Sequence, residues 1–209
     1  MTTRAKIASQ KVPKMPSVLL IGGVRSGKSS GATRLVQSSA VPTDRVAVVV
    51  FGIVGVDGEF DSRITRHQLE RPTSWDAIEV SLGDDWVSCV SDYDAVIVDC
   101  VGTMLSQFVA PVTAPGAQTK TPTQEDVASW AISQFDSLLS SPAHVVIVTN
   151  EVGLGLVSEY PIGRVFTDSM GHMNRWLADK CDRTFLYVAG IPVDLHRIES
   201  EPSWSARGE

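Results

Sequence analysis

The sequence predicts an α/β protein built on a doubly wound, mostly parallel sheet with helices on both faces. Short runs rich in valine and isoleucine recur along the chain and are apolar on both faces, as strands buried in parallel sheets are. Segments with helical periodicity lie between them, and this alternation is typical of doubly wound sheets. An apolar fraction of 43% in 209 residues suits a folded domain with a substantial core.

The predicted strands follow one another along the whole regular part of the chain. Five buried strands are predicted at SVLLIG (Ser17–Gly22), RVAVVVF (Arg45–Phe51), DAVIVDC (Asp94–Cys100), HVVIVT (His144–Thr149) and TFLYVA (Thr184–Ala189). A sixth run, WDAIEV (Trp75–Val80), alternates more between polar and apolar residues, so we expect it at an edge of the sheet.

Four segments between these strands are predicted to be helical. They are Lys28–Ser38, Asp57–Leu69, Glu125–Ser140 and Ile162–Lys180. The third has Thr123 available as its N-cap and acidic residues in its first turn. The last two each show one apolar face, formed by Val127, Ala131, Phe135, Leu138 and Leu139 in one and by Val165, Phe166, Met170, Met173 and Leu177 in the other.

The ends of the chain differ from its middle. Residues 1–16 carry four Lys/Arg, two prolines and no acid, and are predicted to be a flexible basic tail. Residues 17–195 are predicted to form one catalytic domain, and residues 196–209 a C-terminal tail. Ala110–Gln124 is a loop rich in Pro, Thr and Gly, long enough to act as a lid.

Composition and charge exclude several classes of protein. The net charge of −6 provides no general attraction for nucleic acid, so we expect no such partner. No apolar run has the length of a membrane span and the N-terminus has no apolar signal-peptide core, so a cytoplasmic location is expected. The three cysteines, at positions 89, 100 and 181, are widely spaced and fit reduced thiols rather than disulfides or a metal cluster.

A phosphate-binding loop pattern follows the first strand directly. GGVRSGKSS contains Gly-x-x-x-x-Gly-Lys-Ser between a strand and a helix, a context that disfavours the alternative of a glycine-rich turn that binds nothing. Backbone N–H groups of such a loop and the helix N-terminus bind phosphate oxygens. We expect Lys28 to reach the β- and γ-phosphates and the Ser29 hydroxyl to ligate Mg²⁺. The predicted nucleotide-binding residues of the loop are Gly22, Gly23, Val24, Arg25, Ser26, Gly27, Lys28 and Ser29.

Acidic and amide residues follow two other strands. Asp99 ends an apolar run, at the edge of an open α/β sheet where ligands bind, and is predicted to assist Ser29 with Mg²⁺; the alternative is a carboxylate that caps a turn. The sequence offers no candidate base for the Cys100 thiol, so Cys100 is interpreted as a small core residue rather than a nucleophile. Asn150 and Glu151 lie at another strand end, where they either face the site or cap the strand.

Several segments, in order, resemble one family, the bifunctional adenosylcobinamide kinases / adenosylcobinamide-phosphate guanylyltransferases of cobalamin assembly (CobU-like). The matching segments are LLIGGVRSGKS, DGEFDSRITRHQLERPTSWDAIEV, VIVDCVGTML, VTNEVGLGLVSEYPIGRVFTDSMGHMNRWLA and VAGIPVDLH. The fourth resembles the family's Asn-Glu-Val-Gly signature, followed on one helix by Arg164, Phe166, Asp168, Gly171 and Asn174. The resemblance extends from about residue 18 to 193 and implies a P-loop NTPase-like fold.

The resemblance assigns a role to a histidine in RITRHQLERP. His67 occupies the position that takes GMP in the family, and a neutral imidazole is a good nucleophile near pH 7. From this segment alone, a solvated histidine on a polar helix is the alternative. The resemblance also implies guanine-nucleotide contacts, at Gln68, Leu69, Glu70, Arg71, Glu79 and Asp99 and at Phe51, Gly52 and Ile53. Glu79 is expected to accept hydrogen bonds from guanine, and Arg71 to pair with phosphate.

Three places depart from the family pattern. Phe51–Ile53 replace a small Ala-Thr pair, Gln107 replaces an asparagine and Ser158 a proline, but none of these removes a reacting group. The resemblance therefore implies phosphorylation of adenosylcobinamide by ATP or GTP, followed by GMP transfer from GTP through His67. The alternatives are a small-molecule kinase without the second step and a non-catalytic GTP-binding regulator. The family also implies a homo-oligomer, namely a trimer.

Overall fold

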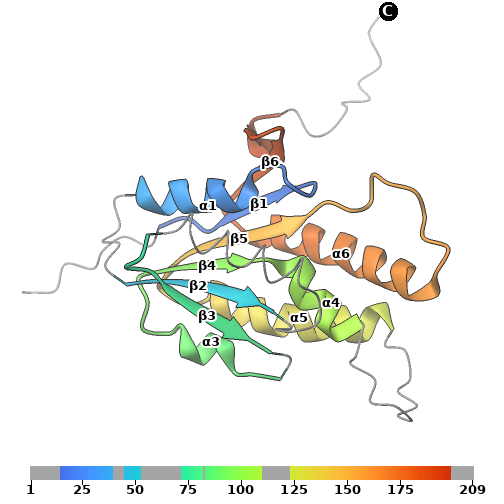
Figure 1. Ribbon diagram of the computed structural model, residues 1–209, viewed down its shortest axis with the longest axis horizontal. Helices are drawn as coiled ribbons and strands as arrows, with labels where there is room; N and C mark the ends of the chain where they lie inside the picture. Colours follow the sequence, from blue (N-terminus) through green and yellow to red (C-terminus); the bar gives the residue numbers. More distant parts are fainter. Residues whose placement is uncertain (1–14, 40–44, 53–71, 82, 110–122, 199–209) are drawn as a thin grey trace, which may run out of the picture.

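The computed structural model describes residues 15–39, 45–52, 72–81, 83–109 and 123–198. In this part of the chain, seven strands form one sheet in the order β3-β2-β4-β5-β1-β6-β7 (Figure 1). The strands are β1 (Val18–Gly22), β2 (Val46–Phe51), β3 (Asp76–Val80), β4 (Ala95–Asp99), β5 (His144–Asn150), β6 (Arg183–Val188) and β7 (Ile191–Asp194). All neighbours are parallel except β6 and β7, so the predicted mostly parallel sheet is confirmed, with β3 at its edge as expected.

The helices of the described residues agree with three of the four predicted ones. They are α1 (Lys28–Gln37), α3 (Trp86–Cys89), α4 (Val101–Val109), α5 (Gln124–Leu139) and α6 (Pro161–Lys180), with a 3-10 turn at Leu195–Arg197. The helix predicted at Asp57–Leu69 lies outside the described residues. Helix α4 is absent from the predicted elements, because its apolar residues follow the apolar run of β4 with only Asp99 and Cys100 between them.

The N-cap predicted for α5 is confirmed. The Thr123 hydroxyl accepts a hydrogen bond from the Asp126 N–H (3.2 Å), and the Asp126 carboxylate accepts one from the Thr123 N–H (2.9 Å). This reciprocal pair is a capping box, which satisfies two backbone donors that the helix itself leaves without partners. Acidic side chains in the first turn also suit the positive end of the helix dipole.

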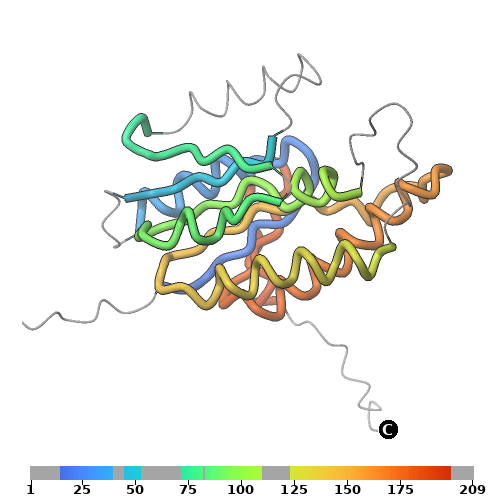
Figure 2. The backbone as a smooth tube through the Cα atoms, turned by 90° about the horizontal axis from the view of Figure 1, so that it is seen from below, coloured from blue at the N-terminus to red at the C-terminus, as the bar shows by residue number. Residues whose placement is uncertain are grey.

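Helices cover both faces of the sheet (Figures 1 and 2). Along β1, Leu20 faces α1 and packs with Ala32 and Val36, whereas the adjacent Leu19 faces the opposite layer. That layer consists of α3, α4, α5 and α6 and contains the larger of the two apolar clusters. Because successive side chains of a strand point to opposite faces, strands apolar on both sides require this double cover.

Three aromatic rings anchor the edge of the larger layer. Trp86, in the short α3, lies edge-on to Phe51 of β2 and to Phe135 of α5, with ring centroids 5.6 and 6.1 Å away. All three side chains are almost completely buried. Edge-to-face pairs of this kind add about 0.5–1.5 kcal/mol to the gain from burial alone, so this cluster ties β2 firmly to the helices.

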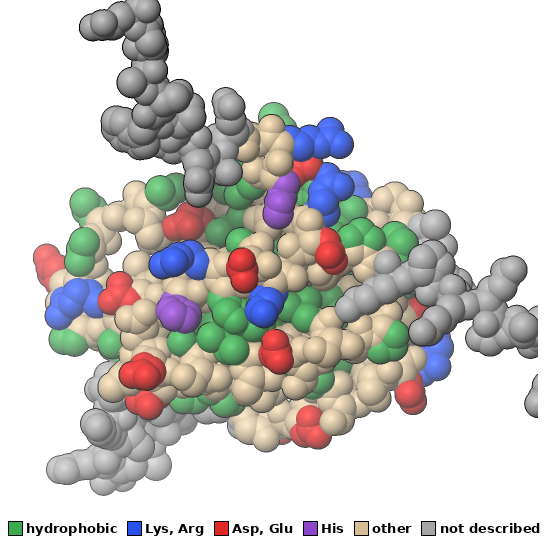
Figure 3. Space-filling view, turned by 180° about the vertical axis from the view of Figure 1, so that it is seen from behind, with side chains coloured by type: hydrophobic (Ala, Val, Ile, Leu, Met, Phe, Trp, Pro, Cys, Tyr) green, Lys and Arg blue, Asp and Glu red, His purple; other side chains and the backbone are tan. Residues whose placement is uncertain are grey.

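One face of the molecule is mixed in charge. Figure 3 shows acidic and basic side chains interspersed over one face of the molecule, without a patch of a single sign on the described residues seen there. Among the described helices, none combines the length and the apolar character that crossing a bilayer requires.

Candidate active site

The candidate site lies at the carboxyl end of the parallel strands. β5 runs between β1 and β4, so Gly22, Asn150 and Asp99 end three neighbouring strands at the same edge of the sheet. Residues 23–27 leave β1 as a loop and lead into α1. This edge is where open α/β sheets bind their ligands, because strand ends and helix N-termini meet there.

The backbone of the loop requires its two signature glycines. A Cβ atom on Gly22 would lie 2.4 Å from the backbone oxygen of Tyr187 in β6, far inside contact distance. Gly27 has φ +94°, and a Cβ atom there would lie 3.1 Å from the Cα of Gly190. The turn between β6 and β7 thus packs directly against the loop, and the Gly190 N–H donates to the Ser26 carbonyl at 2.9 Å.

The N-terminus of α1 is suited to an anion. Its N-cap is Gly27, which offers no capping side chain, and no acidic residue lies in the first turn. The first N–H groups of a helix have no intrahelical acceptor and carry the positive end of the helix dipole. Phosphate oxygens are therefore well matched to this position.

Lys28 is the first residue of α1 and is folded back onto the loop. Its Nζ donates hydrogen bonds to the carbonyls of Gly22 (2.8 Å) and Gly23 (2.6 Å) and lies 3.3 Å from the Ser26 hydroxyl. The side chain is only 6% exposed, and burial lowers the pKa of its ammonium group, an effect that the charge of Asp99 partly opposes. A buried cation whose partners in the described part of the chain are neutral oxygens is ready to exchange them for phosphate oxygens.

The two residues predicted to hold Mg²⁺ are brought together. The Ser29 hydroxyl, on α1, donates to the Asp99 carboxylate, at the end of β4, over 3.1 Å, although the two residues are 70 positions apart. Among the described residues, no group of three or more His, Cys, Asp or Glu side chains forms a metal site. A hydroxyl and one carboxylate nevertheless fit Mg²⁺, which typically takes one or two protein oxygens and completes its shell with water and phosphate.

The Cys100 thiol next to this pair is not an activated nucleophile. Burial, together with the nearby Asp99 carboxylate, raises its pKa, so the thiol stays protonated. Its sulfur lies 3.1 Å from the Thr103 hydroxyl. This agrees with the interpretation of Cys100 as a small packing residue.

Other predicted site residues lie apart from the loop or outside the described residues. Glu79 is exposed on β3, four strand spacings or about 19 Å from β1. The Phe51 ring is 2% exposed and packs on Trp86 in the apolar core, and the nucleotide contact expected at Phe51 and Gly52 stays a prediction. The predicted nucleophile and its neighbours, His67, Gln68, Leu69, Glu70 and Arg71, and also Ile53, lie outside the described residues.

Two departures from the family pattern lie away from the phosphate loop. The Ser158 hydroxyl accepts from the Tyr160 N–H at 3.3 Å, and its carbonyl accepts from Arg164 at 2.9 Å, so this residue shapes the turn before α6. Gln107 is buried in α4, and its side-chain nitrogen has no hydrogen-bond partner in the described part of the chain. Neither side chain belongs to the phosphate loop.

Polar contacts behind the loop are not evident from the sequence. The resemblance includes Asn174 only in a family pattern, yet this residue is buried in α6 and hydrogen-bonded to Thr149 and Asn150 of β5. A polar residue between Met173 and Leu177, on the apolar side of a helix, is the signal that points to it.

Comparison with known proteins agrees with this geometry. The family model for cobinamide kinase / cobinamide phosphate guanyltransferase matches residues 18–195. The bifunctional adenosylcobalamin biosynthesis protein CobU of Salmonella typhimurium is 33% identical over 187 residues, covering 85% of this chain and 98% of that protein. The corresponding CobP protein of Pseudomonas aeruginosa is 30% identical over 179 residues, covering 85% and 95%.

A solved structure supports the fold alone. An ATPase of a bacterial type III secretion system superimposes with a TM-score of 0.50 at 10% identity, covering 86% of this chain and 56% of that one. The sequence motif, the strand order and a distant solved structure thus all support the P-loop NTPase-like fold. On the match of the family model and the identity to two curated relatives, the chain belongs to the cobinamide kinase / cobinamide phosphate guanyltransferase family.

Proposed function

We propose that this protein phosphorylates adenosylcobinamide with ATP or GTP and then transfers GMP from GTP to the new phosphate, giving adenosylcobinamide-GDP. The observation that carries the proposal is the phosphate loop with buried Lys28 beside the Ser29–Asp99 contact of 3.1 Å. Family membership, and the names of relatives that span nearly the same length, support the two activities and the substrate.

The kinase step requires charge stabilisation at the transferred phosphoryl group. The terminal hydroxyl of the substrate side chain attacks the γ-phosphorus, the bond to the β-phosphate oxygen breaks, and the hydroxyl proton leaves to solvent or a base. Lys28 and the loop N–H groups offset the charge on the phosphates, and Ser29 and Asp99 would hold Mg²⁺, which would supply further positive charge there. The loop backbone is held in place by the fold before the substrate binds, as catalysis by electrostatic stabilisation requires, whereas Lys28 exchanges its carbonyl partners for phosphate oxygens.

The guanylyl step is assigned to His67 on its sequence position in the family. One imidazole nitrogen attacks the α-phosphorus of GTP and pyrophosphate leaves, so that a P–N bond replaces a P–O bond. A phosphate oxygen of adenosylcobinamide phosphate then attacks the same phosphorus and releases the histidine. Two displacements let GTP and the bulky corrinoid use the site in turn. We also propose, from the family alone, that the protein works as a homo-oligomer, namely a trimer.

Labelling separates this proposal from its rivals. With α-³²P-GTP and Mg²⁺, we expect the protein to retain label after denaturation, to lose it in acid, and to take up none in His67→Ala. His172→Ala, which removes an exposed histidine of α6, is the matched control and should label normally.

The two rival functions would give different results. A kinase without the second step transfers γ-³²P from ATP or GTP to cobinamide but never carries the α-label. A GTP-binding regulator binds nucleotide and consumes none when cobinamide is present. Either result would overturn the two-step proposal.

A further inference from the structure

A buried polar contact joins α6 to the end of β5. Thr149 is 0% exposed and its hydroxyl donates to the Asn174 side-chain oxygen at 2.7 Å. Asn174, itself 7% exposed, uses its side-chain nitrogen to donate to the Asn150 carbonyl at 3.0 Å. Polar groups buried among apolar side chains are costly unless they are paired, so this contact is a specific feature of the interior.

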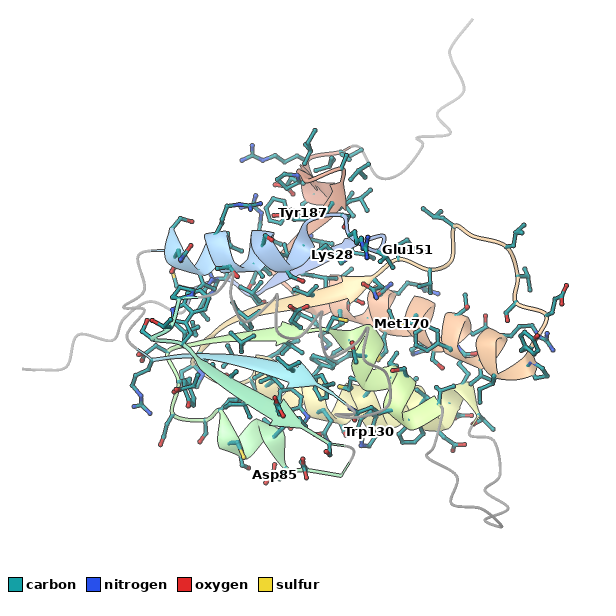
Figure 4. All side chains as sticks on the ribbon, viewed as in Figure 1. Lys28, Asp85, Trp130, Glu151, Met170 and Tyr187 are labelled. Atoms are coloured by element: carbon teal, nitrogen blue, oxygen red, sulfur yellow. The ribbon has the colours of Figure 1, made fainter. Side chains whose placement is uncertain are left out.

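The peptide unit that Asn174 holds is also bound on its other side. The Asn150–Glu151 peptide accepts from Asn174 through its carbonyl and donates through the Glu151 N–H to the Gly22 carbonyl at 3.0 Å. The same Gly22 carbonyl accepts from the Lys28 ammonium at 2.8 Å. Lys28 and Glu151 accordingly lie together in Figure 4, above the end of β5.

An unbroken series of hydrogen bonds therefore runs from α6 to the phosphate loop. Gly22 and Asn150 are the last paired residues of β1 and β5, so no further ladder contact between these strands lies beyond them. The Gly22 carbonyl then accepts from the Glu151 N–H, whose peptide plane Asn174 holds, while Gly22 pairs with Tyr187 of β6 on the other side of β1. Hydrogen bonds in series polarise one another, which strengthens each of them in a buried setting.

We infer that Asn174 is a positioning residue for the phosphate loop. It does not touch the nucleotide; it fixes the peptide that sets the start of the loop and the resting place of Lys28. When the ammonium leaves the Gly22 carbonyl for phosphate, the Glu151 N–H still satisfies that carbonyl, so the loop keeps its shape. The inference rests on the proposed binding of nucleotide at this loop.

An isosteric substitution tests the donated hydrogen bond. Asn174→Asp keeps the shape of the side chain and an acceptor for Thr149, but its carboxylate cannot donate to the Asn150 carbonyl. At pH 8, we expect about tenfold weaker binding of a fluorescent ribose-labelled GTP with Mg²⁺, because a buried acceptor has lost its donor. Burial raises the pKa of the new carboxyl group. As the pH falls to 6, protonation restores a donor, and binding relative to wild type should improve at least threefold.

Two further variants complete the test. Thr149→Val removes the hydroxyl that orients Asn174, and should weaken binding about threefold. Ser169→Ala, on the same helix, removes a buried hydroxyl that has no partner in the described part of the chain, and should bind as wild type. Melting temperatures of all variants separate loss of binding from loss of folding.

The outcomes decide the inference without ambiguity. A folded Asn174→Asp protein that binds as wild type at pH 8, or whose deficit does not change with pH, overturns it. If that variant fails to fold, Thr149→Val decides: binding equal to that of Ser169→Ala overturns the inference. A wild-type protein that binds no GTP would instead refute the proposed function, which keeps the two failures distinct.

Discussion

Lys28 offers a substitution that separates stability from phosphate binding. The residue is 6% exposed, its ammonium is hydrogen-bonded to neutral oxygens, and burial lowers the pKa of that group. The two carbonyls that it occupies each keep another donor, since Gly22 accepts from the Glu151 N–H (3.0 Å) and Gly23 from the Ser26 N–H (3.4 Å). Lys28→Met therefore removes the buried charge, keeps a side chain of similar length and leaves neither carbonyl without a donor.

The expected change in the free energy of unfolding is much smaller than the expected change in nucleotide affinity. Burying a charge costs free energy, so an apolar side chain in its place relieves that cost. Because lost hydrogen bonds offset the relieved desolvation, we expect the free energy of unfolding to stay within about 1 kcal/mol, a shift of melting temperature below about 4 °C. Contacts of the ammonium with the β- and γ-phosphates contribute about 1.5–3 kcal/mol each. Nucleotide binding should therefore weaken by at least about 3 kcal/mol, or about a hundredfold.

Lys28 makes the stability of the folded protein depend on pH in a definite direction. Between the lowered pKa of Lys28 and its ordinary value of 10.5, the unfolded chain binds a proton that the folded protein does not. The stability of the wild type relative to Lys28→Met should therefore rise with pH across this window.

Calorimetry and titration with labelled GTP check these expectations. Lys180→Met, which removes a lysine from the exposed end of α6, is the control and should change neither property markedly. A loss of 3 kcal/mol or more in the stability of Lys28→Met would show that the lysine is mainly structural. Unchanged nucleotide affinity would refute the assignment of the loop.

Two other predictions follow from the geometry. Gly22→Ala should destabilise the protein by about 1–3 kcal/mol, because its Cβ atom would lie 2.4 Å from the Tyr187 oxygen, whereas Gly23→Ala meets nothing within 4 Å. Equal melting temperatures for these two variants would contradict the described loop. Burial lowers the pKa of His144 from its ordinary 6.5, so stability should fall as pH drops from 6.5 towards the lowered value, and His144→Gln should flatten this slope. A slope unchanged in that variant would assign the acid sensitivity to other groups.

Local pattern predicts most of the elements because it reflects local physics. Val/Ile runs indicate buried strands, and the capping box of α5 follows from Thr123 and Asp126 three positions apart. The same reasoning misses α4, where an apolar strand passes into an apolar helix with no glycine, proline or charged residue between them except Asp99. Periodicity alone cannot divide a continuous apolar run of this kind.

The sequence by itself determined the fold class, the phosphate loop and the family resemblance, because each is written in short segments with a characteristic spacing. Only the tertiary structure decided that Ser29 meets Asp99, that the Phe51 ring is buried, and that Asn174 supports the loop. These facts depend on β5 lying between β1 and β4 and on α6 packing behind them. Strand order arises from packing between distant segments, and no local pattern encodes it.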